Sequence, residues 1–183
     1  GNSVEFPQVE IYEGTYVTTK YLVDSSDVDQ RYLLVDSSAD TNTLTVKVQN
    51  STSDTTSTTF TKATDITQLS SSSNVYYLQE VESGKFEVYF GDGNVSKSLS
   101  DGNIVILQYV VTNKSLANGA NSFNATSAID GVTNINLLVN VPARGGAEAE
   151  SIKSIKLNAP LDYASQGRAV TTDDYKVFVR KLF

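Results

Sequence analysis

The chain has 183 residues, of which 39% are hydrophobic and 9% aromatic, and its formal net charge is −7. This composition indicates a folded protein with a modest core, and the negative charge disfavours nucleic acid and membrane surfaces as partners. Cysteine, histidine, methionine and tryptophan are all missing, which removes thiolate chemistry, the usual zinc ligands and the common nucleophile–base pairs. We therefore expect no catalytic residue, no metal site and no cofactor.

The first third of the chain has the patterning of β-structure. Apolar residues alternate with polar ones, or β-branched and aromatic residues dominate, in segments that predict strands at 9–12, 15–23, 32–35 and 43–48. Pro7 places the first of these at a sheet edge. We read 50–59 and 70–74, which are rich in Ser, Thr and Asn, as exposed polar loops. Between them, residues 60–69 form either a short strand or one helical turn.

An acidic loop at 24–30 carries Asp24, Asp27 and Asp29. Three carboxylates in one loop favour either a solvated turn or a cation site. Their spacing does not match that of a calcium-binding loop, so the turn is the preferred interpretation, and cation binding at 24–29 remains open.

The middle of the chain combines strands with two turn motifs. Phe86, Val88 and Phe90 share one face of a predicted strand, and residues 104–111 are apolar on both faces, as in a strand covered on two sides. Between these strands, Gly91, Asp92 and Gly93 predict a tight turn, as do residues 100–103. The glycines do not make a phosphate-binding loop, since the GK[ST] ending and a following helix are missing. A further alternating strand is predicted at 135–141.

The pattern becomes helical after Pro142. Apolar residues recur at intervals of three or four from Ala147 onward, and Pro160 is expected to end this helix. Arg168 then lies in a turn, where a guanidinium can pin the chain to a carboxylate or to carbonyl groups. A second helix follows, with an apolar stripe made by Tyr175, Phe178, Val179 and Leu182. This stripe either packs on its own domain or meets a partner chain.

These elements predict an α+β protein. A β-rich domain of mainly antiparallel strands occupies 1–141, and a helix–turn–helix segment occupies 142–183. Because the chain begins without methionine and ends inside a predicted helix, we expect it to be a fragment of a longer polypeptide.

Two segments carry a family resemblance in their order and separation. The first is FGDGNVSKSLSDGNIVILQYVVTNKSLANGANSF at 90–123; the second is GGAEAESIKSIKLNAPLDYASQGRAVTTDDY at 145–175. Together they resemble the baseplate J-like proteins of contractile-tailed phages, and most closely the T4-type wedge proteins of the inner baseplate ring. The chain departs from the family pattern at 95–97, where family members often have a glycine.

The resemblance implies a structural scaffold in the virion tail baseplate, made in the host cytoplasm. It implies that the chain associates with itself, as a homodimer or ring, and with other wedge proteins, and that it takes part in the switch that triggers sheath contraction. No catalytic residue carries over from the family. The alternative is an adhesin-like or carbohydrate-binding β module, which a shallow tyrosine-lined groove would favour, whereas a flat apolar patch would favour the scaffold.

Overall fold

The computed structural model describes residues 4–27, 29–165, 168, 170–172, 175, 176 and 179. The chain divides into two compact units, Gly1–Gly146 and Ala147–Phe183. The first contains the whole β-sheet and the second contains the α-helix, which confirms the α+β prediction.

The elements follow one another in a simple order. The strands are β1 (Thr15–Leu22), β2 (Tyr32–Leu34), β3 (Ala39–Gln49), β4 (Ser57–Lys62), β5 (Val75–Glu80), β6 (Phe86–Tyr89) and β7 (Ile104–Val111). Three short 3-10 helices are η1 (Ile66–Gln68), η2 (Glu82–Gly84) and η3 (Lys114–Ala117), and the helix of the second unit is α1 (Ile152–Ser165). Residues 60–69 thus contain both candidates for that segment, the end of β4 and one helical turn.

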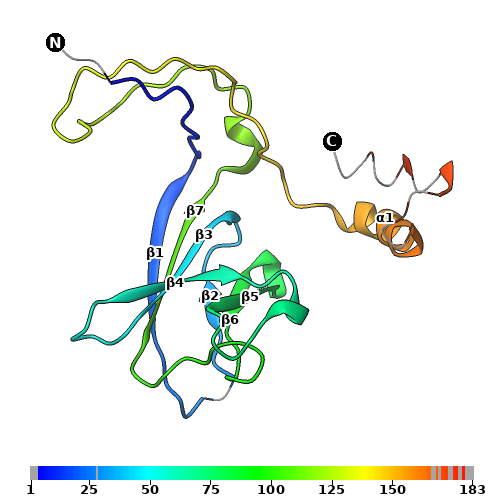
Figure 1. Ribbon diagram of the computed structural model, residues 1–183. Coiled ribbons are helices and arrows are strands. Elements are labelled where there is room, and N and C mark those ends of the chain that lie inside the picture. The colour runs from blue at the N-terminus through cyan, green and yellow to red at the C-terminus, as the bar shows by residue number, and fades with distance from the viewer. Residues whose placement is uncertain are drawn as a thin grey trace. The chain divides into compact units, whose positions relative to one another are not determined.

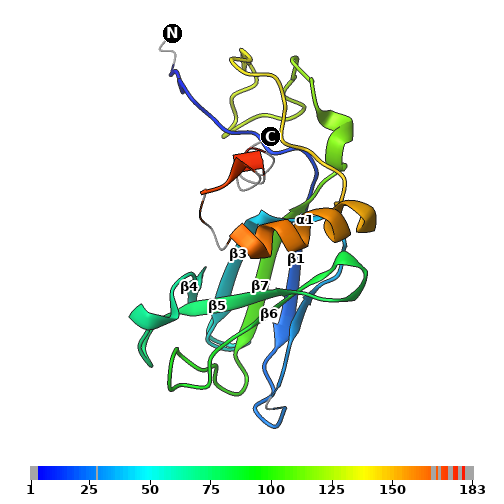
Figure 2. The same cartoon turned by 90° about the vertical axis from the view of Figure 1, so that its right-hand side faces the viewer.

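The seven strands form one sheet in the order β1-β7-β3-β4-β5-β6-β2. All neighbours are antiparallel except β4 and β5, which pair in parallel through Thr61 with Val75 and Lys62 with Tyr76. β1, β7 and β3 run alongside one another, while β4 and β5 run across them (Figures 1 and 2). The sheet therefore turns sharply at β4, where the pairing changes.

This turn brings the two edge strands together, so the sheet is nearly closed. The Tyr21 hydroxyl on β1 donates to the Leu33 carbonyl on β2 at 2.5 Å. The rings of Tyr21, Tyr32, Phe90 and Phe60 make successive edge-to-face contacts, with centroids 5.7, 5.6 and 5.3 Å apart. Burial raises the pKa of Tyr32 to about 12, as expected for a phenol inside this aromatic row.

The core fills the inside of the curled sheet. Its fully buried side chains include Leu34, Val46, Val88, Leu107 and Tyr109. On β7, which lies between β1 and β3, buried residues alternate with partly buried ones, which agrees with the strand predicted at 104–111. Phe86 and Phe90 pack against the same core as Val88, so the predicted shared face is confirmed.

Two predicted strands are wrong. Residues 9–12 and 135–141 alternate apolar and polar side chains, yet neither belongs to a strand of the sheet. Alternation records which side chains share a face, whereas a strand also needs a neighbour for its backbone hydrogen bonds. The polar loop predicted at 50–59 is also too long, because its last three residues belong to β4.

The helix boundaries differ from the prediction at both ends. α1 begins at Ile152 rather than Ala147, because the Ser151 hydroxyl accepts the Ser154 amide at 3.3 Å and caps the helix there. Pro160 does not end the helix, which continues through it to Ser165. Pro160 is exposed, so water can reach the backbone carbonyl that loses its hydrogen bond at this position.

Candidate functional site

The predicted Gly91-Asp92-Gly93 turn is held by its own aspartate. The Asp92 carboxylate accepts the Asn94 amide at 3.0 Å and the Asn94 side-chain amide at 2.9 Å. These hydrogen bonds lower the pKa of Asp92. The Gly93 amide donates to the Ser96 carbonyl at 2.9 Å and closes the loop. The backbone amides that would cradle a phosphate are thus bonded within the turn, which supports its structural interpretation.

Ser96 gives this turn its inner contact, and sequence reasoning missed it. Ser96 is fully buried, and a Cβ on Gly91 would lie 2.0 Å from its Oγ. Its hydroxyl meets that of Tyr77 at 3.4 Å, and the next amide, on Lys97, donates to the Ser73 carbonyl at 3.1 Å. Residues 95–97, where the sequence departs from the family pattern, thus contain a buried serine that packs against Gly91. That departure was the available signal for this contact.

The acidic loop is a set of capped turns. Asp24 accepts the amide and hydroxyl of Ser26 at 2.9 and 2.6 Å, which lowers the pKa of Asp24. Asp27 accepts the Asp29 amide at 3.3 Å. Among the residues described, no group of three His, Cys, Asp or Glu side chains is placed to hold a metal ion. The Asp24 and Asp27 carboxylates thus accept hydrogen bonds from backbone amides of the same loop.

Arg168 lies just beyond the end of α1. Its backbone amide donates to the Ser165 carbonyl at 2.8 Å, and the buried Ser165 hydroxyl donates to the Asp162 carbonyl at 2.8 Å. Both bonds satisfy carbonyl groups of the last helical turn, as helix termini require. Pro160 lies inside α1, before this last helical turn. Asp173 and Asp174, the first acidic residues after Arg168 in the sequence, lie outside the described residues.

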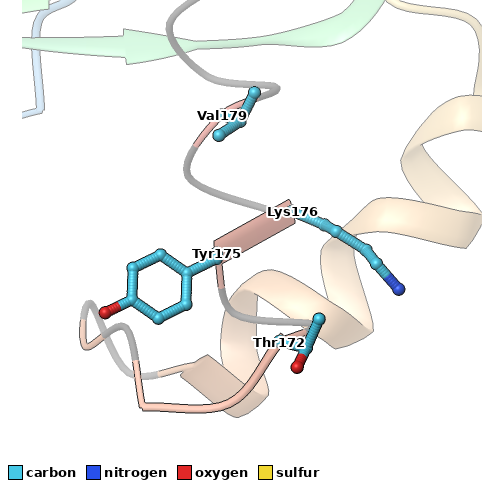
Figure 3. A pocket seen from close by; sticks show the side chains of 4 residues that line it. All are labelled: Thr172, Tyr175, Lys176 and Val179. Carbon is cyan, nitrogen blue, oxygen red and sulfur yellow. The ribbon is translucent and has the colours of Figure 1, made fainter.

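The predicted apolar stripe is exposed where the structure describes it. Tyr175 and Val179 are helical and are 60% and 54% exposed. With Thr172 and Lys176 they line an open hollow of about 360 Å³, and Tyr175 and Lys176 project to opposite sides of the backbone (Figure 3). Phe178 and Leu182 lie outside the described residues. The described half of the stripe is therefore an accessible apolar surface.

Further apolar side chains are exposed outside the sheet. On α1 these are Ile152, Ile155, Leu157, Leu161 and Tyr163, and in the first unit they include Phe6, Ile11, Ile129, Leu138 and Val141. Large exposed apolar groups gathered in particular segments mark surfaces that contact other proteins, whereas isolated ones need no explanation. These segments lie before β1, after β7 and in the helical unit.

Tyr77 on β5 and Tyr89 on β6 contact neighbouring side chains and do not form an open sugar platform. Tyr77 and Tyr89 stack on each other with centroids 5.2 Å apart, and the Arg31 guanidinium lies 4.2 Å from the centre of the Tyr89 ring. A hollow of about 120 Å³ at the ends of β3, β4 and β7 is lined mainly by Ser, Asn and Lys97 rather than by tyrosine. The Tyr77 and Tyr89 rings are thus in contact with each other and with Arg31, whereas Tyr16 on β1 is exposed.

A family model described as Bacteriophage baseplate wedge protein gp6, third domain, matches residues 17–122. The chain belongs to this family. The matched span contains β2 to β7 entirely and nearly all of β1, so the baseplate wedge protein gp6 third domain is the curled sheet described above. The resemblance seen in residues 90–123 is confirmed by this match.

A curated relative gives the same assignment. The chain is 31% identical over 135 residues to the baseplate wedge protein gp6 of Enterobacteria phage T4, which covers 62% of this chain and 20% of the relative. The chain thus spans about a fifth of the relative's length. The family match ends at residue 122, so Pro160, Arg168 and the apolar stripe lie beyond it. In the part of the chain that the structure covers, no helix is long and apolar enough to cross a membrane.

Proposed function

We propose that this chain is a structural part of a contractile-tail baseplate wedge and has no catalytic activity of its own. Its sheet is a gp6-type third domain, and apolar side chains lie exposed in the segments outside that sheet. Protein–protein interfaces are apolar and poor in charge at their centres. The exposed residues around Leu138 have this character, and Tyr175 and Val179 add exposed apolar side chains beside Lys176. The virion baseplate is the proposed location, and the host cytoplasm the proposed place of synthesis.

The proposed role has two parts. The chain joins neighbouring wedge proteins and associates with a second copy of itself, as a homodimer or ring, through the stripe that contains Tyr175 and Val179. It also takes part in the rearrangement that leads to sheath contraction, which requires contacts that differ between two assembled states. The exposure of the stripe supports the first part, and the division of the chain into two units supports the second.

Light scattering over a range of protein concentrations tests this proposal. We expect the wild-type mass to rise above 19.8 kDa with concentration. The Tyr175→Ser/Val179→Ser variant should stay monomeric, because it loses the apolar centre of the contact. The matched control is Tyr16→Ser/Val95→Ser, which removes a tyrosine and a valine of similar exposure from the first unit and should associate like wild type.

Two results would count against the proposal. A wild-type protein that stays monomeric at high concentration, or a control pair that abolishes association equally, argues against the stripe as the contact. Reproducible turnover of a glycan or peptide substrate, lost in a single-carboxylate variant, argues against a purely structural role.

A further inference from the structure

The segment that follows β7 is closed at its base by one asparagine side chain. The Asn118 side-chain nitrogen donates to the Gly146 carbonyl at 2.7 Å, and the Asn118 Oδ1 accepts the Gly146 amide at 3.0 Å. One side-chain amide thus binds both backbone groups of a residue 28 positions away. Gly146 is also the last residue of the first unit.

A second pair of hydrogen bonds runs beside the first. The Gly119 amide donates to the Ala143 carbonyl at 2.7 Å, and the Ala143 amide donates to the Ala120 carbonyl at 2.8 Å. Four hydrogen bonds therefore join the two ends of residues 118–146. Closing so long a loop costs chain entropy, which these bonds offset.

Gly146 fits this position because no side chain could. A Cβ at Gly146 would lie 2.1 Å from the Lys114 carbonyl oxygen and 3.1 Å from the Asn118 Oδ1. This close approach explains the second glycine of the Gly145-Gly146 pair, a feature of the sequence that the proposed function does not use.

The segment that carries Asn118 is attached to the sheet. Asn118 follows η3, and its amide donates to the Ser115 carbonyl at 3.1 Å. η3 follows β7 closely, and between them the Asn113 amide donates to the Glu13 carboxylate, just before β1, at 3.0 Å. The Asn113 side chain binds the same carboxylate. The Asn118–Gly146 contact is thus continuous with the end of the sheet where β1 begins and β7 ends.

We propose that Asn118 is a clasp that locks residues 119–145 into a closed loop and fixes the point where the chain leaves the first unit. The loop then behaves as part of the sheet unit although it forms no strand of the sheet. Bending between the units is confined to residues that follow Gly146, where Ala147–Ser151 belong to neither helix nor strand. A pulling force on the helical unit is therefore transmitted through the Asn118–Gly146 hydrogen bonds to η3 and β7, and residues 119–145 are not extended.

Trypsin provides the test, because the hydrogen-bonded residues Ala143 and Gly146 flank the peptide bond after Arg144, which trypsin can cleave. Arg144 is exposed, it is the only Lys or Arg between Lys114 and Lys153, and it lies between the hydrogen-bonded residues Ala143 and Gly146. A protease needs a locally opened backbone, so cleavage after Arg144 reports how often the clasp opens. Asn118→Ala removes two hydrogen bonds and should raise the rate of this cleavage roughly ten- to thirty-fold. Gly146→Ala, which drives a Cβ into the Lys114 carbonyl, should raise it at least as much.

Two controls make the result specific. Asn121→Ala changes an exposed asparagine three residues away and should leave the cleavage rate after Arg144 unchanged. Cleavage after Lys47, within β3, reports opening of the sheet and should stay at the wild-type rate in both clasp variants. Rapid wild-type cleavage after Arg144, or equal rates for Asn118→Ala and Asn121→Ala, would overturn the proposal. Equal acceleration after Lys47 and Arg144 would also overturn it, because Asn118 would then stabilise the whole unit rather than close the loop.

Discussion

Apolar residues in the core of the curled sheet differ in exposure from those in the segments outside the sheet. Leu107 on β7 is fully buried between neighbouring strands, whereas Leu138, in the loop after β7, is 82% exposed. Leu107 occurs in a nearly continuous apolar run and Leu138 in an alternating stretch, and both segments are predicted to be strands. β7 pairs with β1 and β3 of the same chain, while 135–141 has no neighbouring strand among the described residues. The difference indicates that the sheet makes the fold, and that the outer segments are available for assembly.

Replacing one leucine in each region should give the largest difference in the free energy of unfolding between the two regions. Leu107→Ala leaves a cavity in the core and should lower the free energy of unfolding by about 2–5 kcal/mol. Leu138→Ala removes a side chain that is already in water and should change it by less than about 0.5 kcal/mol. Urea denaturation of both variants measures the two values. A large loss for Leu138→Ala would show that the outer loop belongs to the core.

Replacing one glycine in each region should give smaller changes in the free energy of unfolding, with a different cause in each region. Gly91→Ala pushes a methyl group against Ser96 and should cost about 1–3 kcal/mol of stability. Gly131, in the outer loop, has room for a methyl group, since no atom beyond the adjacent residues lies within 4 Å of the place a Cβ would take, but its φ is +79°. Gly131→Ala should therefore cost about 1–2 kcal/mol from backbone strain alone.

The second substitution Ser96→Ala separates the two mechanisms. It removes the hydroxyl nearest to the added methyl group and should relieve part of the cost of Gly91→Ala, but none of the cost of Gly131→Ala. Denaturation of the single and double variants gives the coupling energies. Additive effects for the Gly91 and Ser96 pair, within about 0.3 kcal/mol, would show that the close contact does not determine the choice of glycine.

The sequence predicted the sheet best where local pattern and tertiary environment agree. β7 follows from a run of residues that is apolar on both faces, and the shared face of Phe86, Val88 and Phe90 follows from apolar alternation. The turns at 91–94 and 100–103 follow from glycine and asparagine, and Gly93 and Gly102 do adopt positive φ. The near-closure through Tyr21 and Leu33 depends on contacts between strands, which periodicity along one strand does not report.

The candidate site was predictable only in part, because a local sequence pattern does not report tertiary contacts. Tyr175 and Val179 were identified from helical spacing, but spacing does not say whether a face is buried or exposed. Ser151 and Pro160 misled the helix prediction, because a capping hydroxyl delays the start and an exposed proline is tolerated inside. The contact between Asn118 and Gly146 spans 28 positions and has no periodic signal.

Hydrogen–deuterium exchange at low and high protein concentration tests the central claim most directly. The account predicts that peptides containing Tyr175 and Val179 become more protected as concentration rises, while peptides from β1 to β7 keep their exchange rates. Increased protection along β1, an edge strand of the sheet, with none around Tyr175, would contradict the account. It would show that the sheet itself, rather than the segments outside it, makes the contact between copies.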